Sequence, residues 1–177
     1  MLNLSQAPQN TYCADRAWSD QYIPEIRRLV GPHLLKPAPE DLDTKQATDL
    51  MLLDARDMRL AARVRRPGYA ERYPNEITIR SRATFGGETE LAKIVNGKGD
   101  WMFYGHASAR GMAIDPWWLI DLRAFRAALI RRSDVHGLRY GAQQNPDGTQ
   151  FVWFDLTSFP AYPPLVVAQS ASAVMAA

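Results

Sequence analysis

The sequence predicts an α/β fold, with α+β as the alternative, in which helices flank a mixed central sheet. Short apolar or alternating runs, which are typical of strands, stand between segments of helical period. The chain has 177 residues, which is the size of one domain. Hydrophobic residues make up 46% of the chain and charged residues 23%, so the composition excludes a mostly disordered or fibrous protein.

The first predicted element is a helix that follows a polar arm. Residues 1–17 have no hydrophobic period, and we expect them to form a flexible arm. Asp20 is placed to cap a helix that has Pro24 in its first turn and ends at Gly31-Pro32. The buried side of this helix is expected to consist of Ile26, Leu29 and Val30.

Three strands are expected next. The segments 48–54 and 59–66 are short apolar or alternating runs, and the link DARD between them is short enough for a hairpin. Residues 75–82 repeat the alternating pattern. We expect the strand 59–66 to lie between the other two and to pair with both.

The pattern of the second half of the chain predicts two helices and three strands. A helix is expected at residues 88–97, because acids stand in its first turn and Gly97 ends it. Further segments are predicted in the order strand, strand, helix and strand, at residues 100–107, 117–122, 123–132 and 151–156. We expect one globular domain over residues 18–168 and a flexible tail over residues 169–177.

Arginine is concentrated in one part of the chain. The formal net charge is only +2, but residues 56–82 contain eight arginines and three acidic residues, a local charge of +5. Alternation places arginines on one face of each of the strands 59–66 and 75–82. Guanidinium groups suit bidentate contact with phosphate. We therefore expect nucleic-acid binding, with the candidate contacts Arg59, Arg63, Arg65, Arg66, Arg72, Arg80 and Arg82.

The segment between these two strands also carries aromatic residues. Tyr69, Arg72 and Tyr73 stand between two prolines, so we expect a stiffened loop that projects from the sheet. The tryptophans that fall in predicted strands are instead expected in the core or at an interface, in preference to platforms on which bases stack. These are Trp101, Trp117, Trp118 and Trp153.

The predicted order over residues 18–107 is helix, three strands, helix and strand, which resembles the core of the restriction-endonuclease-like superfamily, the PD-(D/E)XK nucleases. The later strand, helix and strand would form a C-terminal extension. In that family an Asp on one strand and an acidic-x-Lys set on the next hold Mg²⁺ for phosphodiester hydrolysis. Asp49 stands at the position of the first Asp, whereas Ala61-Ala62-Arg63 stands where acidic-x-Lys is expected.

Some members of the superfamily carry the missing acid on the helix after the strands. The resemblance then implies a rearranged site in which Asp49 and Glu90 hold Mg²⁺ and Lys93 completes the catalytic set. The segments TDL, ARVRR, TIRSR and ETELAKI are also similar to uncharacterised bacteriophage and prophage proteins. Two of these residues have an ordinary alternative: Asp49 pairs with a nearby arginine, and Glu90 pairs with Lys93 along the helix. Separately, His106 follows a predicted strand end, a place suited to a functional side chain, although a hydrogen-bonded loop histidine is commoner.

Three functions therefore stay open. The first is a phage or mobile-element nuclease that depends on Mg²⁺. The second is a catalytically inactive protein of the same fold that binds nucleic acid or a host protein through its arginine face. The third is an unrelated enzyme with a small anionic substrate. No apolar run is long enough for a membrane span and a single Cys allows no internal disulfide, so we expect a cytoplasmic protein without a membrane partner.

Overall fold

The structure, a computed structural model, describes residues 14, 17–37, 50–52, 58–82, 87–109, 111–131 and 137–173. Of residues 35–37 and 50–52 it describes the backbone. The helices are α2 (Ile23–Val30), α4 (Glu90–Val95) and α5 (Leu122–Ile130), with 3₁₀ turns η1 (Gly31–Leu34) and η2 (Leu156–Ser158). The strands are β1 (Leu35–Pro37), β2 (Leu50–Leu52), β3 (Leu60–Arg65), β4 (Glu76–Arg82), β5 (Trp101–Ala107), β6 (Ile114–Asp121), β7 (Tyr140–Gln144), β8 (Gln150–Asp155) and β9 (Val166–Gln169).

The described part of the chain is mixed α/β, as the sequence predicts, but its long strands form two sheets in place of one. The four-stranded sheet has the order β3-β5-β6-β9, in which β3 is parallel to β5 and the other neighbours are antiparallel. The three-stranded sheet has the order β4-β8-β7 and is antiparallel. The short strands β1 and β2 pair with each other.

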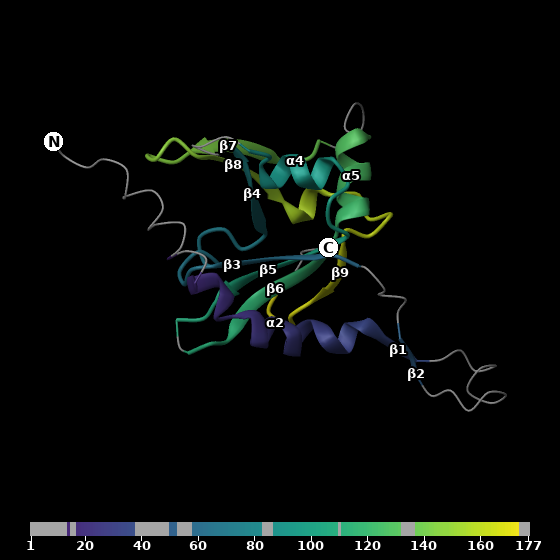
Figure 1. The fold of residues 1–177 in the computed structure, drawn as a ribbon. Helices are drawn as coiled ribbons and strands as arrows, with labels where there is room; N and C mark the ends of the chain where they lie inside the picture. Colours follow the sequence, from purple (N-terminus) through teal and green to yellow (C-terminus); the bar gives the residue numbers. More distant parts are fainter. Residues whose placement is uncertain are drawn as a thin grey trace.

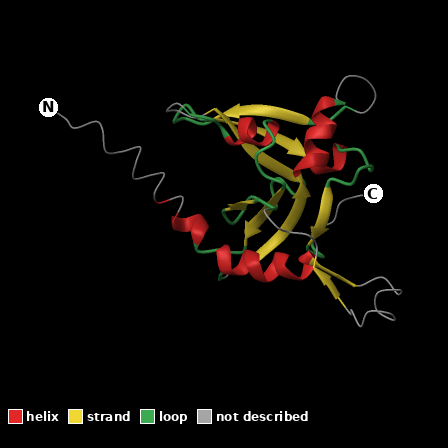
Figure 2. Cartoon of the chain, turned by 45° about the vertical axis from the view of Figure 1, so that its right-hand side comes forward, coloured by secondary structure: helices red, strands yellow, loops and turns green. Residues whose placement is uncertain are grey.

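Both faces of the four-stranded sheet are covered (Figure 1). Helix α2 covers one face, where Ile26 packs in a core with Leu119 of β6. The three-stranded sheet, α4 and α5 cover the other face, where Trp118 of β6 packs in a second core with Phe125 of α5. Figure 2 shows the helices on opposite sides of this sheet. A strand segment that is buried on both faces needs apolar residues at every position, which explains the continuous apolar run at residues 117–120 of β6.

Helix α2 agrees with the sequence pattern except at its start. Pro24 stands in the first turn, and Ile26 and Val30 are buried, as predicted. The N-cap residue is Tyr22, whose side chain makes no capping hydrogen bond. The expected cap by Asp20 is therefore wrong, and the helix depends on its apolar side for stability.

Helices α4 and α5 both begin with a capping side chain. The hydroxyl of Thr89 accepts the backbone N–H of Ala92 at 3.2 Å. The carboxylate of Asp121 accepts the N–H groups of Arg123 at 2.6 Å and of Ala124 at 3.2 Å. These contacts satisfy donors that a helix start leaves open. No helix in the described part of the chain has the length and apolar character of a membrane span.

The strand pairing differs from the sequence-based expectation. Strand β3 pairs in parallel with β5, whereas β4 belongs to the other sheet and pairs with β8. Strand β2, from the segment expected to pair with β3, pairs with β1. An alternating pattern indicates which residues share a face, but it does not identify the neighbouring strand. The three-stranded meander that the resemblance implies is therefore not formed by β2, β3 and β4.

The C-terminal segment packs further along the chain than expected. Ala173 is 2% exposed and belongs to the core beneath the three-stranded sheet. The N–H of Trp117 donates to Ser170 Oγ at 3.2 Å, and the Ser172 hydroxyl donates to the Asp115 carboxylate. The fold therefore continues to Ala173, beyond the boundary expected at residue 168.

Gly105 in β5 provides a test of the packing against α2, because a Cβ atom there would lie 2.4 Å from Ile114 Cγ2. We expect Gly105→Ala to lower the free energy of unfolding by about 1–3 kcal/mol, since buried groups must move. Urea denaturation followed by circular dichroism measures this loss. Gly137→Ala is the control, because Gly137 is not among the glycines of positive φ and no described atom beyond its chain neighbours lies within 4 Å of its Cβ position. Equal losses in the two variants would contradict the packing.

Candidate nucleic-acid interface

The arginines of β3 face the space between the two sheets. Ala61, Arg63 and Arg65 share one face of the strand, and Ala61 packs against the core beneath the three-stranded sheet. Arg63 donates from Nη1 to Glu90 Oε2 on α4. The Arg63 side chain is 23% exposed and that of Glu90 is 30% exposed, so water screens this ion pair only in part. The arginine face of β3 is therefore turned inward.

The carboxylate of Glu90 connects three elements. It lies in the first turn of α4, receives the guanidinium group of Arg63 from β3, and accepts the backbone N–H of Arg80 in β4 at 3.1 Å. Strand β4 is at the edge of its sheet, so this N–H has no strand neighbour on that side. Glu90 thereby joins β3, β4 and α4 and satisfies a donor at the sheet edge.

Tyr104 of β5 covers the same edge of β4. Its hydroxyl accepts the N–H of Thr78 at 3.2 Å and lies 3.1 Å from Thr78 Oγ1. Arg65 donates from Nη1 to that Oγ1 at 3.0 Å. Thr78 is 7% exposed and Tyr104 is 1% exposed, so these polar atoms satisfy one another where water has little access. Side chains from the first sheet thus close the open edge of the second.

Tyr104 is a residue of this interface that the sequence pattern does not single out. It lies in the run DWMFYGHA, and β5 is buried along almost its whole length. A strand that is apolar on both faces shows no alternation, so its pattern does not indicate which side chains point toward a second sheet.

Of the predicted nuclease residues, the structure describes Glu90 and Lys93. Asp49 lies outside the described residues, and Lys93 is exposed on α4. Glu90 is engaged by Arg63 and by the edge of β4. Among the described residues, no group of three or more His, Cys, Asp or Glu side chains could hold a metal ion.

The predicted arginine contacts divide into anchored and exposed side chains. Arg59 is anchored, because its N–H donates to Asp100 Oδ2 at 2.9 Å and its Nη2 donates to the Gly97 carbonyl at 3.1 Å. The contacts of Arg63 and Arg65 are described above. Arg80 and Arg82 lie in the other sheet, so the single four-arginine face expected from adjacent pairing is not formed. Arg59 is 60% exposed despite its contacts. The other exposed members are Arg66, Arg72, Arg80 and Arg82.

The loop between β3 and β4, residues 66–75, follows the end of β3 (Figure 1). It contains both aromatic and basic residues. The rings of Tyr69 and Tyr73 are stacked with centroids 6.4 Å apart, and each residue is 38% exposed. The Arg65 guanidinium lies 4.3 Å from the Tyr69 ring centroid, and that of Arg66 lies 4.7 Å from the Trp18 ring centroid. The N–H of Tyr73 donates to the Tyr69 carbonyl at 2.9 Å. These contacts fix the position of both tyrosine rings.

His106 is buried within β5, whereas the sequence predicts a hydrogen-bonded loop residue. It is 2% exposed, and its ring lies 5.8 Å from that of Tyr104 and 5.9 Å from that of Trp118. Neither ring nitrogen has a hydrogen-bond partner among the described residues. Burial, followed by the positive charge of Arg65, lowers the pKa of His106 to about 4, against an opposing effect of Glu71. His106 is therefore neutral at pH 7.

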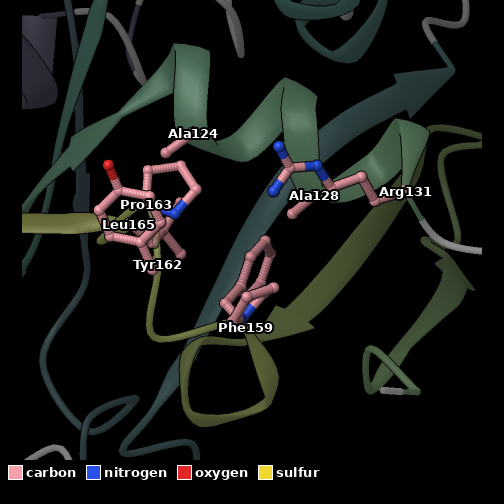
Figure 3. Close-up of a pocket in the computed structure, with 8 residues that line it drawn as sticks. Ala124, Ala128, Arg131, Phe159, Tyr162, Pro163 and Leu165 are labelled. Carbon is pink, nitrogen blue, oxygen red and sulfur yellow. The ribbon is translucent and has the colours of Figure 1, made fainter. Parts of the chain in front are cut away.

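Two hollows are described here, one beside α5 and one beside the β3–β4 loop. Figure 3 shows a small cavity between α5 and residues 159–165, and its volume of about 10 Å³ holds about one water molecule. An open groove of about 310 Å³ lies beside the β3–β4 loop, with Glu71, Pro116 and Ser172 among its lining residues. Arg131 is among the residues that line the small cavity, whereas the arginines of β3 and β4 line neither hollow.

Comparisons of the chain with models of protein families, with curated proteins and with solved structures found no match. Function is therefore inferred from the chemistry of the described residues. The feature that bears on it most directly is the combination of exposed guanidinium groups and half-exposed tyrosine rings on one loop and the strand after it.

Removal of the Glu90 carboxylate tests the junction of the two sheets. We expect Glu90→Ala to lower the free energy of unfolding by about 1–3 kcal/mol, because Arg63 loses its counterion and the N–H of Arg80 loses its acceptor. Glu88→Ala is the matched control. Glu88 pairs with Lys98, whose side chain is 57% exposed, so its removal should cost clearly less. Urea denaturation of both variants compares them, and equal losses would show that the Glu90 contacts do not hold the sheets together.

The burial of His106 predicts a dependence of stability on pH. The unfolded chain binds a proton on His106 near pH 6.5, whereas the folded chain binds it near pH 4. In this interval the unfolded state holds more protons, so the free energy of unfolding should fall by about 3 kcal/mol in total as the pH drops from about 6.5 to about 4. Urea denaturation at intervals between these pH values measures the slope.

Two variants identify the group responsible for this slope. His106→Leu should flatten it, and His33→Gln, which removes an exposed histidine, should retain it. A slope that survives in His106→Leu would contradict the burial of a neutral imidazole in β5.

Proposed function

We propose that the protein binds nucleic acid through a surface formed by the β3–β4 loop and by β4. This arginine–tyrosine surface consists of Arg66, Tyr69, Arg72, Tyr73, Arg80 and Arg82. The observation that carries the proposal is the stacked pair of half-exposed tyrosines in the same loop as the exposed Arg72.

The two tyrosine rings suit the bases and sugars of a nucleic acid. Each is 38% exposed, so part of the ring is available to a ligand. The contact of Arg65 with Tyr69 and the backbone hydrogen bond from Tyr73 hold the pair in place before binding. Side chains that are already fixed lose little conformational freedom when a ligand packs on them. Stacking on aromatic rings contributes to binding of every base, because each base has a flat face.

The exposed arginines suit the phosphates of the same ligand. Arg72 lies in the loop with the tyrosines, and Arg80 and Arg82 extend the positive charge along β4. A planar guanidinium group contacts two phosphate oxygens at once. Glu71 is the single acidic residue of the loop, so the surface stays positive in balance. A polyanion with flat, apolar bases matches both the charge and the rings.

We propose that the protein binds nucleic acid without catalysis, in preference to a magnesium-dependent nuclease. The two contacts of Glu90 give it a structural role as the counterion of Arg63 and the acceptor for β4. We therefore propose no metal-dependent step. The setting we propose is the cytoplasm of a cell that carries a bacteriophage or mobile element, on the basis of the short sequence similarities given above.

Fluorescence anisotropy with a labelled 20-nucleotide single strand and a 20-base-pair duplex tests the proposal. Wild type should bind at 50 mM NaCl, and the logarithm of its association constant should fall linearly with the logarithm of salt concentration, by roughly 0.9 per phosphate contact on a duplex and 0.7 on a single strand. Combined replacement of Arg72 and Arg82 by Ala should weaken binding and reduce this slope by roughly 1–2, since two phosphate contacts are lost.

The matched control is Arg28→Ala, because Arg28 is 68% exposed and lies on α2, outside the proposed surface. It should bind as wild type does. Failure of wild type to bind either probe at 50 mM NaCl would overturn the proposal and favour a host protein as the partner. Cleavage of the probe that requires Mg²⁺, stops with EDTA and is lost in Asp49→Asn would instead support the nuclease.

A further inference from the structure

The outer face of the three-stranded sheet, which lies at the upper margin of Figure 1, carries two aromatic side chains outside both cores. Opposite residues of an antiparallel pair share a face, and Ile77 lies opposite Phe154 while Thr78 lies opposite Trp153. Ile77 and Phe154 pack in the core. Trp153 therefore lies on the outer face, and alternation places Phe151 beside it.

The indole ring of Trp153 lies flat across the neighbouring strand. A Cβ atom at Gly141 of β7 would lie 2.7 Å from Trp153 Nε1 and 2.8 Å from its Cε2 and Cζ2 atoms. The absence of a side chain at Gly141 thus lets the ring rest against the backbone of β7. One side of the indole is covered by the sheet, and the opposite side is directed away from it.

Phe151 and Trp153 form an aromatic platform on this face. They are two residues apart on β8, so their Cα atoms are about 7 Å apart along the strand. Both residues are half-buried, and neither packs against the two apolar cores of the described residues. Stability of the cores therefore does not account for two large aromatic rings at these positions.

We propose that the aromatic platform stacks the unpaired bases of a single-stranded nucleic acid. This inference rests on the proposed function and deepens it, because it names the form of nucleic acid that is bound. The bases of a duplex stack on one another, so their flat faces are not available to a protein side chain along the helix. A flat aromatic ring on an open sheet therefore selects bases that are not paired.

Positively charged side chains lie beside the platform on the side of β4. Arg80 lies opposite Phe151 in the sheet, on the same face. Arg65 donates to Thr78, which lies opposite Trp153, and the same guanidinium lies over Tyr69. The platform is therefore continuous with the β3–β4 loop, and one strand of nucleic acid can contact both.

Two carboxylates of the hairpin carry charge of the opposite sign. Asp147 accepts hydrogen bonds from the N–H of Thr149 at 2.9 Å and from its hydroxyl at 2.6 Å. Asp155 accepts hydrogen bonds from Arg139 Nη2 at 2.7 Å and Nε at 2.9 Å. Internal partners thus hold both groups, and the pKa of each is lowered, for Asp147 by the Thr149 hydroxyl first and for Asp155 by Thr157 and Arg139 against the effect of burial.

Anisotropy titrations with labelled oligo(dT) and oligo(U) of 15 nucleotides and with a duplex of equal length test the platform. Wild type should prefer the single strands. Trp153→Ala and Phe151→Ala should each weaken single-strand binding roughly 5- to 150-fold and leave duplex binding unchanged, because each removes one stacking ring. The oligo(dT) and oligo(U) titrations distinguish DNA from RNA as the preferred strand.

Three controls separate the outcomes. Tyr162→Ala removes an aromatic side chain that is 83% exposed outside the platform, and it should bind as wild type does. Trp153→Phe keeps a stacking ring, so it should recover most of the affinity and show that loss in Trp153→Ala does not come from misfolding. A 15-unit abasic oligonucleotide keeps the phosphates without the bases, and it should bind wild type and Trp153→Ala alike.

Different results would overturn the proposed function and the proposed role of the aromatic platform. Wild type that binds no probe overturns both. Wild type that binds single strands and duplex equally, with unchanged affinity in Trp153→Ala and Phe151→Ala, overturns the platform and leaves the arginine–tyrosine surface in place. A dimer of wild type in light scattering that dissociates in Trp153→Ala would make the platform a contact between two copies of the chain and would also overturn the inference.

Discussion

The two sheets of this protein meet at the open edge of β4, and the Glu90 carboxylate is the group that joins them. Its Oε2 atom receives a guanidinium group from β3 and a backbone N–H from β4, while its own backbone lies in α4. A sheet edge normally needs a further strand, a charge or a cover. Here Glu90 and Tyr104 supply the cover, and the second sheet can therefore lie against the first without sharing a strand with it.

This junction also decides which arginines are available to a ligand. The guanidinium groups of Arg63 and Arg65 are directed into the contact between the sheets. The arginines of β4 and of the loop before it lie outside that contact and are exposed. One dense cluster in the sequence thus serves two purposes, since its inner members hold the sheets and its outer members give the surface its charge. The proposed binding surface is a product of the same junction that stabilises the fold.

Much of the secondary structure could be predicted from the sequence, because helical period and apolar runs are local signals. The helix containing Ile26 and the strand containing Trp118 are examples. The strand pairing could not be predicted. Alternation on β3 places Arg63 and Arg65 on one face of the strand, but it does not indicate that Glu90 of α4 lies against that face. Trp153 falls in a predicted strand, which predicts a place in the core or at an interface, and only the register of β8 with β4 assigns it to the outer face.

The order of the strands along the chain also has a consequence for synthesis of the protein. Strand β4 pairs with β8, and the partners Glu76 and Asp155 are 79 positions apart. While the chain emerges from a ribosome, Ile77 and Ile79 are made long before Phe154 and Val152, the residues that lie opposite them in the completed sheet. Pairing over such a distance is slow and leaves apolar strand surface exposed during folding. A nascent chain that ends before β8 therefore carries an unpaired apolar strand and is a natural substrate for chaperones.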